Sequence, residues 1–217
     1  MDEIKDTLKN LRTNYNLDVL DTETVHPDPV IQFAAWMKIA IDGKVNEPNA
    51  MNLATVSASG QPSSRIVLLR NFDKDGFVFF TNYESNKGRE LFENHNAALN
   101  FFWPELHKQV RIEGKADKVV ESDSEEYFNS RPRESQLGAW VSEQSRELKN
   151  RQELDQKFEN LTRQFEGREV ERPPHWGGFR IKPEMFEFWQ GRPNRLHDRI
   201  QYLLLGTNNW TIRRLYP

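Results

Sequence analysis

The 217-residue sequence contains no cysteine, which excludes disulfide scaffolds, thiol catalysis and cysteine-based metal sites. It also has no long hydrophobic run. The most apolar stretch, FAAWMKIAI, is short and is interrupted by Lys38, so no membrane-spanning segment is expected. The first residues, MDEIKDTLKNLRTNY, are charged throughout and lack the apolar centre of a secretory signal. The expected location is the cytoplasm.

Several catalytic motifs are missing as well. There is no G-x-S-x-G elbow, no Walker loop, no G-x-G-x-x-G fingerprint and no H-E-x-x-H pair. The five histidines show no close paired spacing, so no metal site is expected. The net charge of -3 argues against general nucleic-acid binding, which needs a broad basic field. These absences disfavour serine hydrolases, nucleotide kinases and zinc enzymes.

The N-terminal part is predicted to be helical. Ile4, Leu8, Leu11 and Tyr15 recur at helical spacing and indicate a short amphipathic helix. A second helix is predicted from about residue 30 to residue 43, because an aspartate followed by a proline is a typical helix start.

The middle of the chain is rich in β-type residues. Short strands are predicted at residues 51–57, 63–70, 76–81, 97–103 and 108–120. Ser59-Gly60 and Asp75-Gly76 are turn signals typical of hairpins, and Gly114 suggests a bulge or bend. A short helix is expected at residues 85–95.

Helices return in the second half before the final strands. The sequence SDSE at residues 122–125 predicts a capping box, and Leu154, Phe158, Leu161 and Phe165 mark a longer amphipathic helix. Four strands follow at residues 177–183, 185–190, 199–205 and 210–215. The predicted fold is mainly β with inserted helices (α+β), built on one barrel-like sheet.

Two basic clusters precede the final strands. Arg65 and Arg70 flank an apolar strand and should lie on opposite faces, unless a bulge or strand end intervenes; two edge arginines are the ordinary alternative. Tyr127, Arg131 and Ser135 share one face if their segment is helical, although a proline at position 132 breaks a perfect helix. Hydroxyl, guanidinium and hydroxyl groups together suit a phosphate, whereas an exposed polar helix end is the alternative.

A third cluster lies near the C-terminus, in FWQGRPNRLHDRI. Arg195, His197 and Arg199 alternate and should share one strand face, with Trp189 just before the turn. The alternative is a solvated strand with scattered charges. Two separate anion-binding clusters with an aromatic residue suggest two phosphorylated ligands, a cofactor and a substrate.

These motifs, read in order, resemble the pyridoxine/pyridoxamine 5′-phosphate oxidase family. The resemblance is carried by RIVLLR, FFTNYESNKG, KQVRIEG, YFNSRPRESQLGAWVSEQS, WGGFRI, EFWQGRPNRLHDRI and RLYP. It implies a single FMN-binding split-barrel domain over residues 1–217, with a helical segment at 1–45 and a dimerisation and substrate region at 175–217. It also implies a homodimer with the flavin at the subunit interface. The implied reaction oxidises pyridoxine or pyridoxamine 5′-phosphate to pyridoxal 5′-phosphate, with O2 reoxidising the flavin to give hydrogen peroxide.

The resemblance also assigns site residues by position. Catalytic roles fall on Arg195 and His197, and His197 could also move a proton. The flavin contacts would be Arg65, Ile66, Val67, Leu68, Leu69, Arg70, Phe80, Thr81, Asn86, Lys87, Gln109, Gln144, Ser145, Trp189 and Arg199. The substrate contacts would be Arg12, Tyr15, Arg70, Tyr127, Arg131, Ser135, Arg195 and His197. Arg12 and Tyr15 match a segment that can close over the substrate in this family.

The sequence departs from the family pattern at three positions. The family usually has lysine at Arg70, arginine at Asn86 and a second basic residue at Thr13. Two alternatives stay open: a split-barrel flavin reductase of another substrate, and a non-catalytic protein that binds or carries a phosphorylated ligand such as pyridoxal phosphate. The paired motifs SRPRESQ and RLHD disfavour a simple flavin binder, which would not need both.

Overall fold

The structure is a computed structural model that describes residues 2–10, 14–206 and 209–217. The chain divides into two compact units. We call them the terminal unit, made of Met1–Pro48, Phe101–Arg111 and Met185–Pro217, and the central unit, made of Asn49–Asn100 and Ile112–Glu184.

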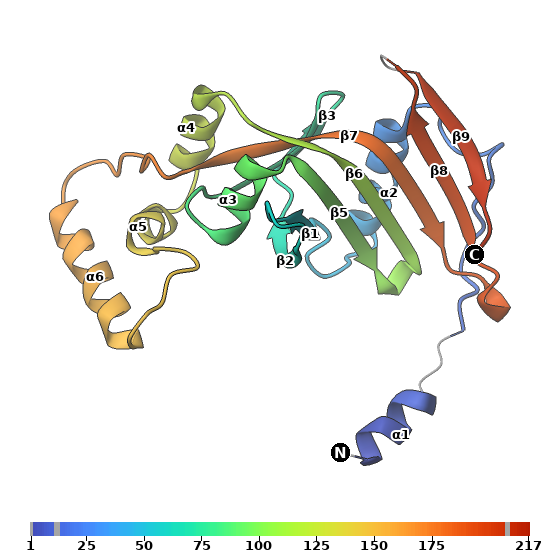
Figure 1. Ribbon diagram of the computed structural model, residues 1–217, viewed down its shortest axis with the longest axis horizontal. Helices are drawn as coiled ribbons and strands as arrows, with labels where there is room; N and C mark the ends of the chain where they lie inside the picture. Colours follow the sequence, from blue (N-terminus) through green and yellow to red (C-terminus); the bar gives the residue numbers. More distant parts are fainter. Residues whose placement is uncertain (1, 11–13, 207–208) are drawn as a thin grey trace. The chain divides into compact units, whose positions relative to one another are not determined.

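The central unit combines strands with helices (Figure 1). Several strands lie in it wholly or in part. They are β1 (Ala50–Val56), β2 (Pro62–Leu68), β3 (Asn71–Asp73), β4 (Gly76–Asn82), β5 (Asn96–Trp103), β6 (Lys108–Lys118) and β7 (Trp176–Gln190). Their order in the sheet is β2-β1-β5-β6-β7-β4-β3, and the last parts of β5 and β7 and the first part of β6 belong to the terminal unit. Alternating burial along β1 and nearly continuous burial along β4 explain the β-rich sequence pattern.

The first of the two predicted hairpins is confirmed, and the second has a different partner strand. β1 and β2 pair antiparallel from Ala50 opposite Leu68 to Val56 opposite Pro62. At the Asp75-Gly76 turn, β4 pairs with the short strand β3 and not with the predicted strand 63–70. A side chain at Gly76 would place its Cβ 2.2 Å from the carbonyl oxygen of Ile181, and the φ of +133° also requires glycine. Position 114 also requires glycine, because a Cβ there would lie 2.0 Å from a carbonyl oxygen of β7.

Four helices belong to the central unit: α3 (Asn86–Glu93), α4 (Glu121–Asn129), α5 (Arg133–Val141) and α6 (Arg151–Gln164). The predicted capping box at residues 122–125 is wrong. The N-cap of α4 is Val120, two residues before Ser122, and it has no side-chain capping bond. Glu125, the acidic member of the predicted box, instead pairs with Arg172 at 2.9 Å.

The terminal unit begins with α1 (Asp2–Asn10) and α2 (Pro29–Asp42). Asp28 caps α2 by accepting hydrogen bonds from two main-chain N–H groups, which confirms that helix start. The first helix was predicted to reach Tyr15, and this is wrong because Tyr15 lies in an irregular segment with its ring packed on other aromatic rings. Among the described residues, no helix is both long and apolar enough to cross a membrane.

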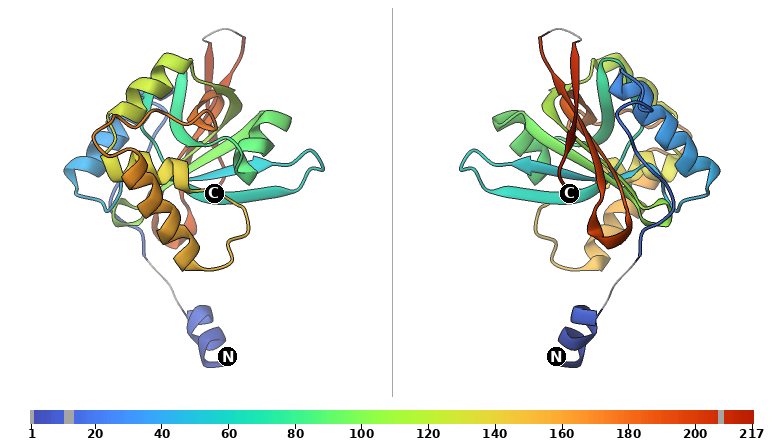
Figure 2. Two further views of the ribbon diagram at one scale, coloured as in Figure 1. Left: turned by 90° about the vertical axis from the view of Figure 1, so that its left-hand side faces the viewer. Right: turned by 90° about the vertical axis from the view of Figure 1, so that its right-hand side faces the viewer.

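β8 (Asp198–Leu204) and β9 (Trp210–Leu215) complete the terminal unit and form a hairpin beside the second half of β7 (Figure 2). Two short 3-10 turns, η1 (Pro104–Leu106) and η2 (Pro193–Arg195), precede β6 and β8. β7 was predicted as two strands and is one. It pairs with β4 up to Ile181 and with β8 from Met185, so Pro183 lies between the two ladders, where no N–H donor is needed.

Candidate functional site

A pocket of about 440 Å³ lies in the central unit. It is lined by residues of β2, β4, α3, α4 and α5, by the first residue of β7, and by the segments that follow β2, α4 and α5. Its residues are Ile66, Val67, Leu68, Arg70, Phe80, Thr81, Asn82, Lys87, Tyr127, Arg131, Ser135, Gly138, Ala139, Ser142, Gln144 and Trp176. Most of the flavin and phosphate contacts expected from the sequence are therefore brought together. Asn82, Gly138, Ala139, Ser142 and Trp176 also line it and were not singled out from the sequence.

The two arginines that flank the second strand have different surroundings. β2 ends at Leu68, and Arg70 lies beyond it, exposed, with its main-chain N–H bonded to the carbonyl of Val78 at 2.9 Å. Arg65 does not line the pocket. Its guanidinium donates to the hydroxyls of Thr55 and Ser63 and pairs with Glu90 at 3.3 Å. Leu69 is buried and does not line the pocket either.

Lys87 provides a buried positive charge at the start of α3. Ser85 caps this helix, and the Lys87 ammonium donates to the Ser85 hydroxyl at 3.0 Å and to the side-chain oxygen of Gln144. Burial lowers the pKa of Lys87 to about 8, with a further lowering by Arg65, while Glu90 acts in the opposite direction. A cation with this environment gains stability when an anion approaches, so this end of the pocket suits a phosphate.

Asn86 and Ser145 lie at the same helix start without lining the pocket. The main-chain N–H of Asn86 donates to the Ser145 hydroxyl at 3.2 Å, and Ser145 has a φ of +71°. The side-chain oxygen of Asn86 accepts a 2.8 Å hydrogen bond from Arg89. A guanidinium therefore lies one helical turn from the position where the family usually has arginine.

Tyr127 lines the pocket from α4, Ser135 lines it from α5, and Arg131 lines it from the short segment between the two helices. Pro132 is the N-cap residue of α5, so α4 and α5 are separate helices. The three side chains therefore do not share one face of a continuous helix. Burial lowers the pKa of Arg131, as does Arg70, whereas Tyr127 raises it. Among the described residues, Nη1 of Arg131 is buried without a hydrogen-bond partner.

Aromatic rings form the wall beside Arg131. Phe80 stacks on Tyr127 at 4.0 Å between ring centroids, and both rings lie nearly parallel to Trp176. The centre of the Arg131 guanidinium lies 4.6 Å from the Trp176 ring centroid. No aspartate or glutamate is among the lining residues, so the pocket presents cations and aromatic faces to a ligand.

A second cluster lies in the terminal unit, and its residues do not line this pocket. The rings of Trp189 and His197 are 4.7 Å apart, and Tyr15 contacts both at 5.7 Å. Tyr15 also packs edge-on against His107, whose Nδ1 is buried without a partner among the described residues. Sequence reasoning did not single out His107 as a site residue, because no motif marks it.

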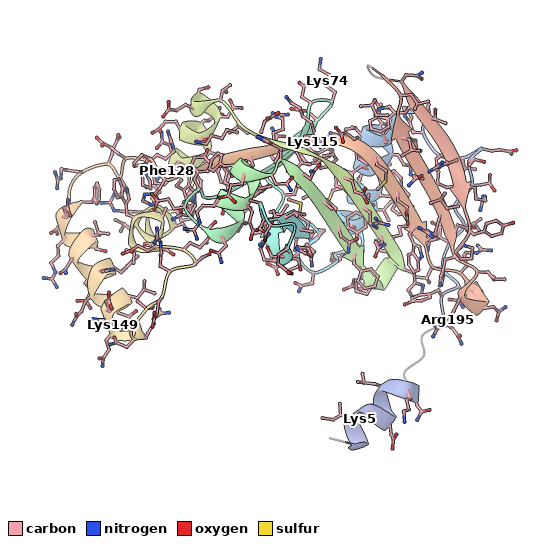
Figure 3. The ribbon with its side chains drawn as sticks, viewed as in Figure 1. Lys5, Lys74, Lys115, Phe128, Lys149 and Arg195 are labelled. Carbon is pink, nitrogen blue, oxygen red and sulfur yellow. The ribbon has the colours of Figure 1, made fainter. Side chains whose placement is uncertain are left out.

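The prediction that Arg195, His197 and Arg199 share a strand face is wrong. Arg195 ends the turn η2 with a φ of +61°, and Asn194 before it has a φ of +58° (Arg195 is labelled in Figure 3). β8 starts only at residue 198, so a tight turn after Gly191, and not a pleated strand, presents the first two side chains.

The remaining predicted residues are placed as follows. Arg199 pairs with the buried carboxylate of Glu187 at 2.9 Å and donates to the carbonyl of Tyr216. Gln109 is partly buried on β6. Arg12 and the departure at Thr13 lie outside the described residues. No group of three potential metal ligands occurs in the described part of the chain.

Comparison with known proteins gives consistent results along the chain. Residues 37–165 match the family model described as pyridoxamine 5′-phosphate oxidase, and residues 176–217 match the pyridoxine 5′-phosphate oxidase C-terminal dimerisation region. A pyridoxine/pyridoxamine 5′-phosphate oxidase of Nostoc sp. is 52% identical over 97% of this chain and 99% of its own length. Its counterpart in Cytophaga hutchinsonii is 51% identical over 99% and 100%.

Solved structures agree with the sequence comparison. PhzG of Burkholderia lata, solved with tetrahydrophenazine-1-carboxylic acid, superposes with a TM-score of 0.87 at 32% identity, covering 93% of this chain and 99% of that one. A pyridoxamine 5′-phosphate oxidase-related, FMN-binding protein of Nostoc punctiforme gives 0.70 at 16% identity, covering 88% and 98%, and shows the fold alone. The fold is that of the FMN-binding split-barrel proteins, mainly β with inserted helices. The chain belongs to the pyridoxamine 5′-phosphate oxidase family and is an oxidoreductase.

Proposed function

We propose that the protein oxidises pyridoxine 5′-phosphate or pyridoxamine 5′-phosphate to pyridoxal 5′-phosphate, with FMN as cofactor and O2 as electron acceptor. The observation that carries this proposal is Arg131, a half-buried cation in the pocket with an unpartnered N–H group, next to Tyr127 and Ser135. The names of relatives that match nearly the whole chain support it.

The lining residues fit FMN. Lys87 and Gln144 provide donors for an anionic group, and Ile66, Val67 and Leu68 provide an apolar strand edge for a planar ring. Bound FMN would supply an acceptor for the hydride of the substrate carbon, and O2 with a proton would take up the two electrons to give hydrogen peroxide. The protein must hold the substrate carbon at the flavin, match charges and limit water.

The substrate phosphate is assigned to Arg131, Tyr127 and Ser135, with Arg70 adding positive charge. Arg131 needs an acceptor for Nη1, and a phosphate dianion offers several oxygens. The guanidinium of Arg70, 5.8 Å from the Tyr127 ring, keeps the charge that lysine usually provides there. Loss of the phosphate from a ligand should therefore leave two cations uncompensated.

Arg195 and His197 are proposed to act on the pyridine ring of the same substrate. Nδ1 of His197 accepts a hydrogen bond from the main-chain N–H of Arg192, so the neutral ring carries its proton on Nε2 and can donate it to a substrate oxygen or nitrogen. We propose that the protein works as a homodimer with the flavin at the subunit interface, in line with the match to a dimerisation region.

A second candidate is oxidation of a larger aromatic acid, favoured by the likeness to PhzG at a TM-score of 0.87. A carboxylate would also pair with Arg131. It offers fewer acceptor atoms and less charge than a phosphate dianion, so it compensates Arg131 and Arg70 less completely.

The test begins with reconstitution. The apo-protein is mixed with FMN and then supplied aerobically with pyridoxine 5′-phosphate or with pyridoxine, while hydrogen peroxide and the aldehyde product are quantified. We expect a yellow protein that forms both products in equal amounts from the phosphorylated compound. A protein that remains colourless, or that oxidises both compounds with equal efficiency, would contradict the proposal.

A further inference from the structure

We propose that Trp176 is a positioning residue for substrate recognition. Its indole face holds the guanidinium of Arg131 in the orientation that receives the phosphate of the substrate, without consuming the N–H groups that bind it. The inference rests on the proposed function and adds a residue to which the sequence motifs gave no role.

The surroundings of Arg131 differ from those of other partly buried arginines in the central unit. Arg180 pairs with Asp73, and Arg172 pairs with two glutamates. Arg131 has no carboxylate partner within the described residues, and its guanidinium instead lies 4.6 Å from the ring of Trp176 and 5.7 Å from that of Phe128. Aromatic faces are therefore the groups that offset its charge.

An aromatic face and a carboxylate differ in what they leave of the charge and the N–H donors of a guanidinium. The negative face of an indole attracts a cation, and tryptophan does so most strongly among the aromatic side chains. This attraction does not occupy the in-plane N–H groups of a guanidinium, whereas a carboxylate accepts two of them and neutralises the charge. Arg131 thus keeps its donors and full charge for an incoming dianion, which agrees with the unpartnered Nη1.

Trp176 is itself held firmly. It is the first residue of β7, only 7% exposed, and its carbonyl accepts a 2.7 Å hydrogen bond from Arg172. Its ring stacks at 12° on Phe80 and packs edge-on against Phe128 at 5.3 Å (Phe128 is labelled in Figure 3). The indole is also parallel to Tyr127, so one stack orients two of the proposed phosphate ligands.

The ordinary alternative is that Trp176 only fills the core, since it belongs to an apolar cluster with Phe128, Leu137 and Val170. The two roles differ in how they depend on Arg131. A core residue affects every ligand and acts whether or not Arg131 is present. A positioning residue affects the phosphorylated ligand alone and loses its effect when Arg131 is absent.

The experiment is a double-mutant cycle on FMN-loaded protein. The concentration dependence of anaerobic flavin reduction gives a dissociation constant and a limiting rate for pyridoxine 5′-phosphate and for pyridoxine. The variants are Trp176→Phe, Trp176→Leu, Arg131→Ala and Arg131→Ala combined with Trp176→Leu. Trp140→Leu is the matched control, because Trp140 packs against the same cluster but does not line the pocket.

We expect Trp176→Leu to weaken binding of pyridoxine 5′-phosphate about tenfold, and Trp176→Phe about threefold, because a cation–π contact is lost or reduced. Pyridoxine binding and the FMN dissociation constant should stay unchanged, and Trp140→Leu should change neither dissociation constant. In the Arg131→Ala background, Trp176→Leu should add no further loss.

An equal loss for both ligands, or a full additional loss in the Arg131→Ala background, would overturn the inference and leave Trp176 as a core residue. If Trp176→Leu does not fold, as judged by circular dichroism, the same cycle with Trp176→Phe decides. A wild-type protein that binds both ligands equally would instead overturn the proposed function, and the inference with it.

Discussion

The main-chain N–H of Arg192 donates a hydrogen bond to Nδ1 of His197 across 3.0 Å. A ring nitrogen that accepts a hydrogen bond carries no proton, so neutral His197 holds its proton on Nε2. Burial lowers the pKa of His197, and Arg195 lowers it further, whereas Asp198 raises it. The imidazole is therefore a neutral donor near neutral pH, which favours hydrogen-bond donation over the proton uptake considered from the sequence.

This arrangement predicts the pH dependence of flavin reduction. The rate should be constant from neutral to mildly alkaline pH and should fall in acid, where a second proton on His197 breaks the bond from Arg192. His197→Asn should reduce the rate roughly 10- to 100-fold, as expected for a lost hydrogen bond to a developing charge, and should abolish the acid limb. Stopped-flow reduction across pH measures both. An acid limb that persists in His197→Asn would assign the titration to another group.

Lys87 predicts a pH dependence of cofactor binding. Its pKa is lowered to about 8 mainly by burial, and a bound phosphate dianion should raise it again. Above that pH, FMN binding must therefore take up a proton, and the dissociation constant should rise by up to about tenfold per pH unit. Fluorescence quenching titrations from pH 7 to pH 9.5 test this. Lys87→Arg stays charged and should give a flat profile; an equally steep profile would exclude Lys87 as the cause.

The same shift predicts a change in the stability of the apo-protein. The unfolded chain keeps this lysine proton up to about pH 10.4, so between about pH 8 and that value the unfolded state binds more protons than the native state. The free energy of unfolding should therefore rise with pH over this window through Lys87. Urea unfolding of apo-protein should show the rise, and Lys87→Met should not. A rise of the same size in Lys87→Met would contradict this origin.

Asn86 predicts a gain of cofactor affinity on substitution. Asn86→Arg should add a bidentate contact to the FMN phosphate worth about 1–3 kcal/mol, roughly a five- to hundred-fold change in dissociation constant. This gain should be reduced by a few tenths of a kcal/mol, because the substitution removes the Asn86 side-chain oxygen that accepts a hydrogen bond from Arg89 one turn away. Flavin titration measures it, with Asn86→Ala as control for the lost amide. Equal constants for wild type and Asn86→Arg would show that position 86 faces solvent.

The position of Arg195 predicts that its substitution lowers the rate of flavin reduction without weakening FMN binding. Arg195 is exposed at the turn η2 and does not line the pocket that contains Lys87. Arg195→Ala should therefore lower the limiting rate of flavin reduction while FMN remains bound. Stopped-flow reduction at saturating substrate is the measurement. Loss of flavin with an unchanged reduction rate would assign Arg195 to the cofactor.

Local elements could be predicted from the sequence because their causes are local. The cap at Asp28 and the turn at Gly76 depend on neighbouring residues and on backbone conformations that few side chains allow. The start of α4 could not be predicted from SDSE, because Glu125 pairs with Arg172, 47 residues away, instead of closing a local capping box. The Arg195 turn was misjudged because alternation of residue types implies a strand only where the backbone is extended.

The pocket followed from the sequence only in part. RIVLLR and SRPRESQ located residues that line it, and their roles in binding stay predictions. The bond between Lys87 and Gln144 joins residues 57 positions apart, and no local pattern indicates it. Trp176 was part of the stretch WGGFRI but received no role from the sequence, although its ring lies beside the Arg131 guanidinium.

Pyridoxine 5′-phosphate is expected to reduce a flavin that is held by this protein. The direct measurement is the visible spectrum of FMN-loaded protein under anaerobic conditions, before and after addition of pyridoxine 5′-phosphate. We expect the flavin absorbance to bleach with one equivalent of substrate, to return on admission of O2, and to change little with pyridoxine. A flavin that stays oxidised with pyridoxine 5′-phosphate would contradict this expectation.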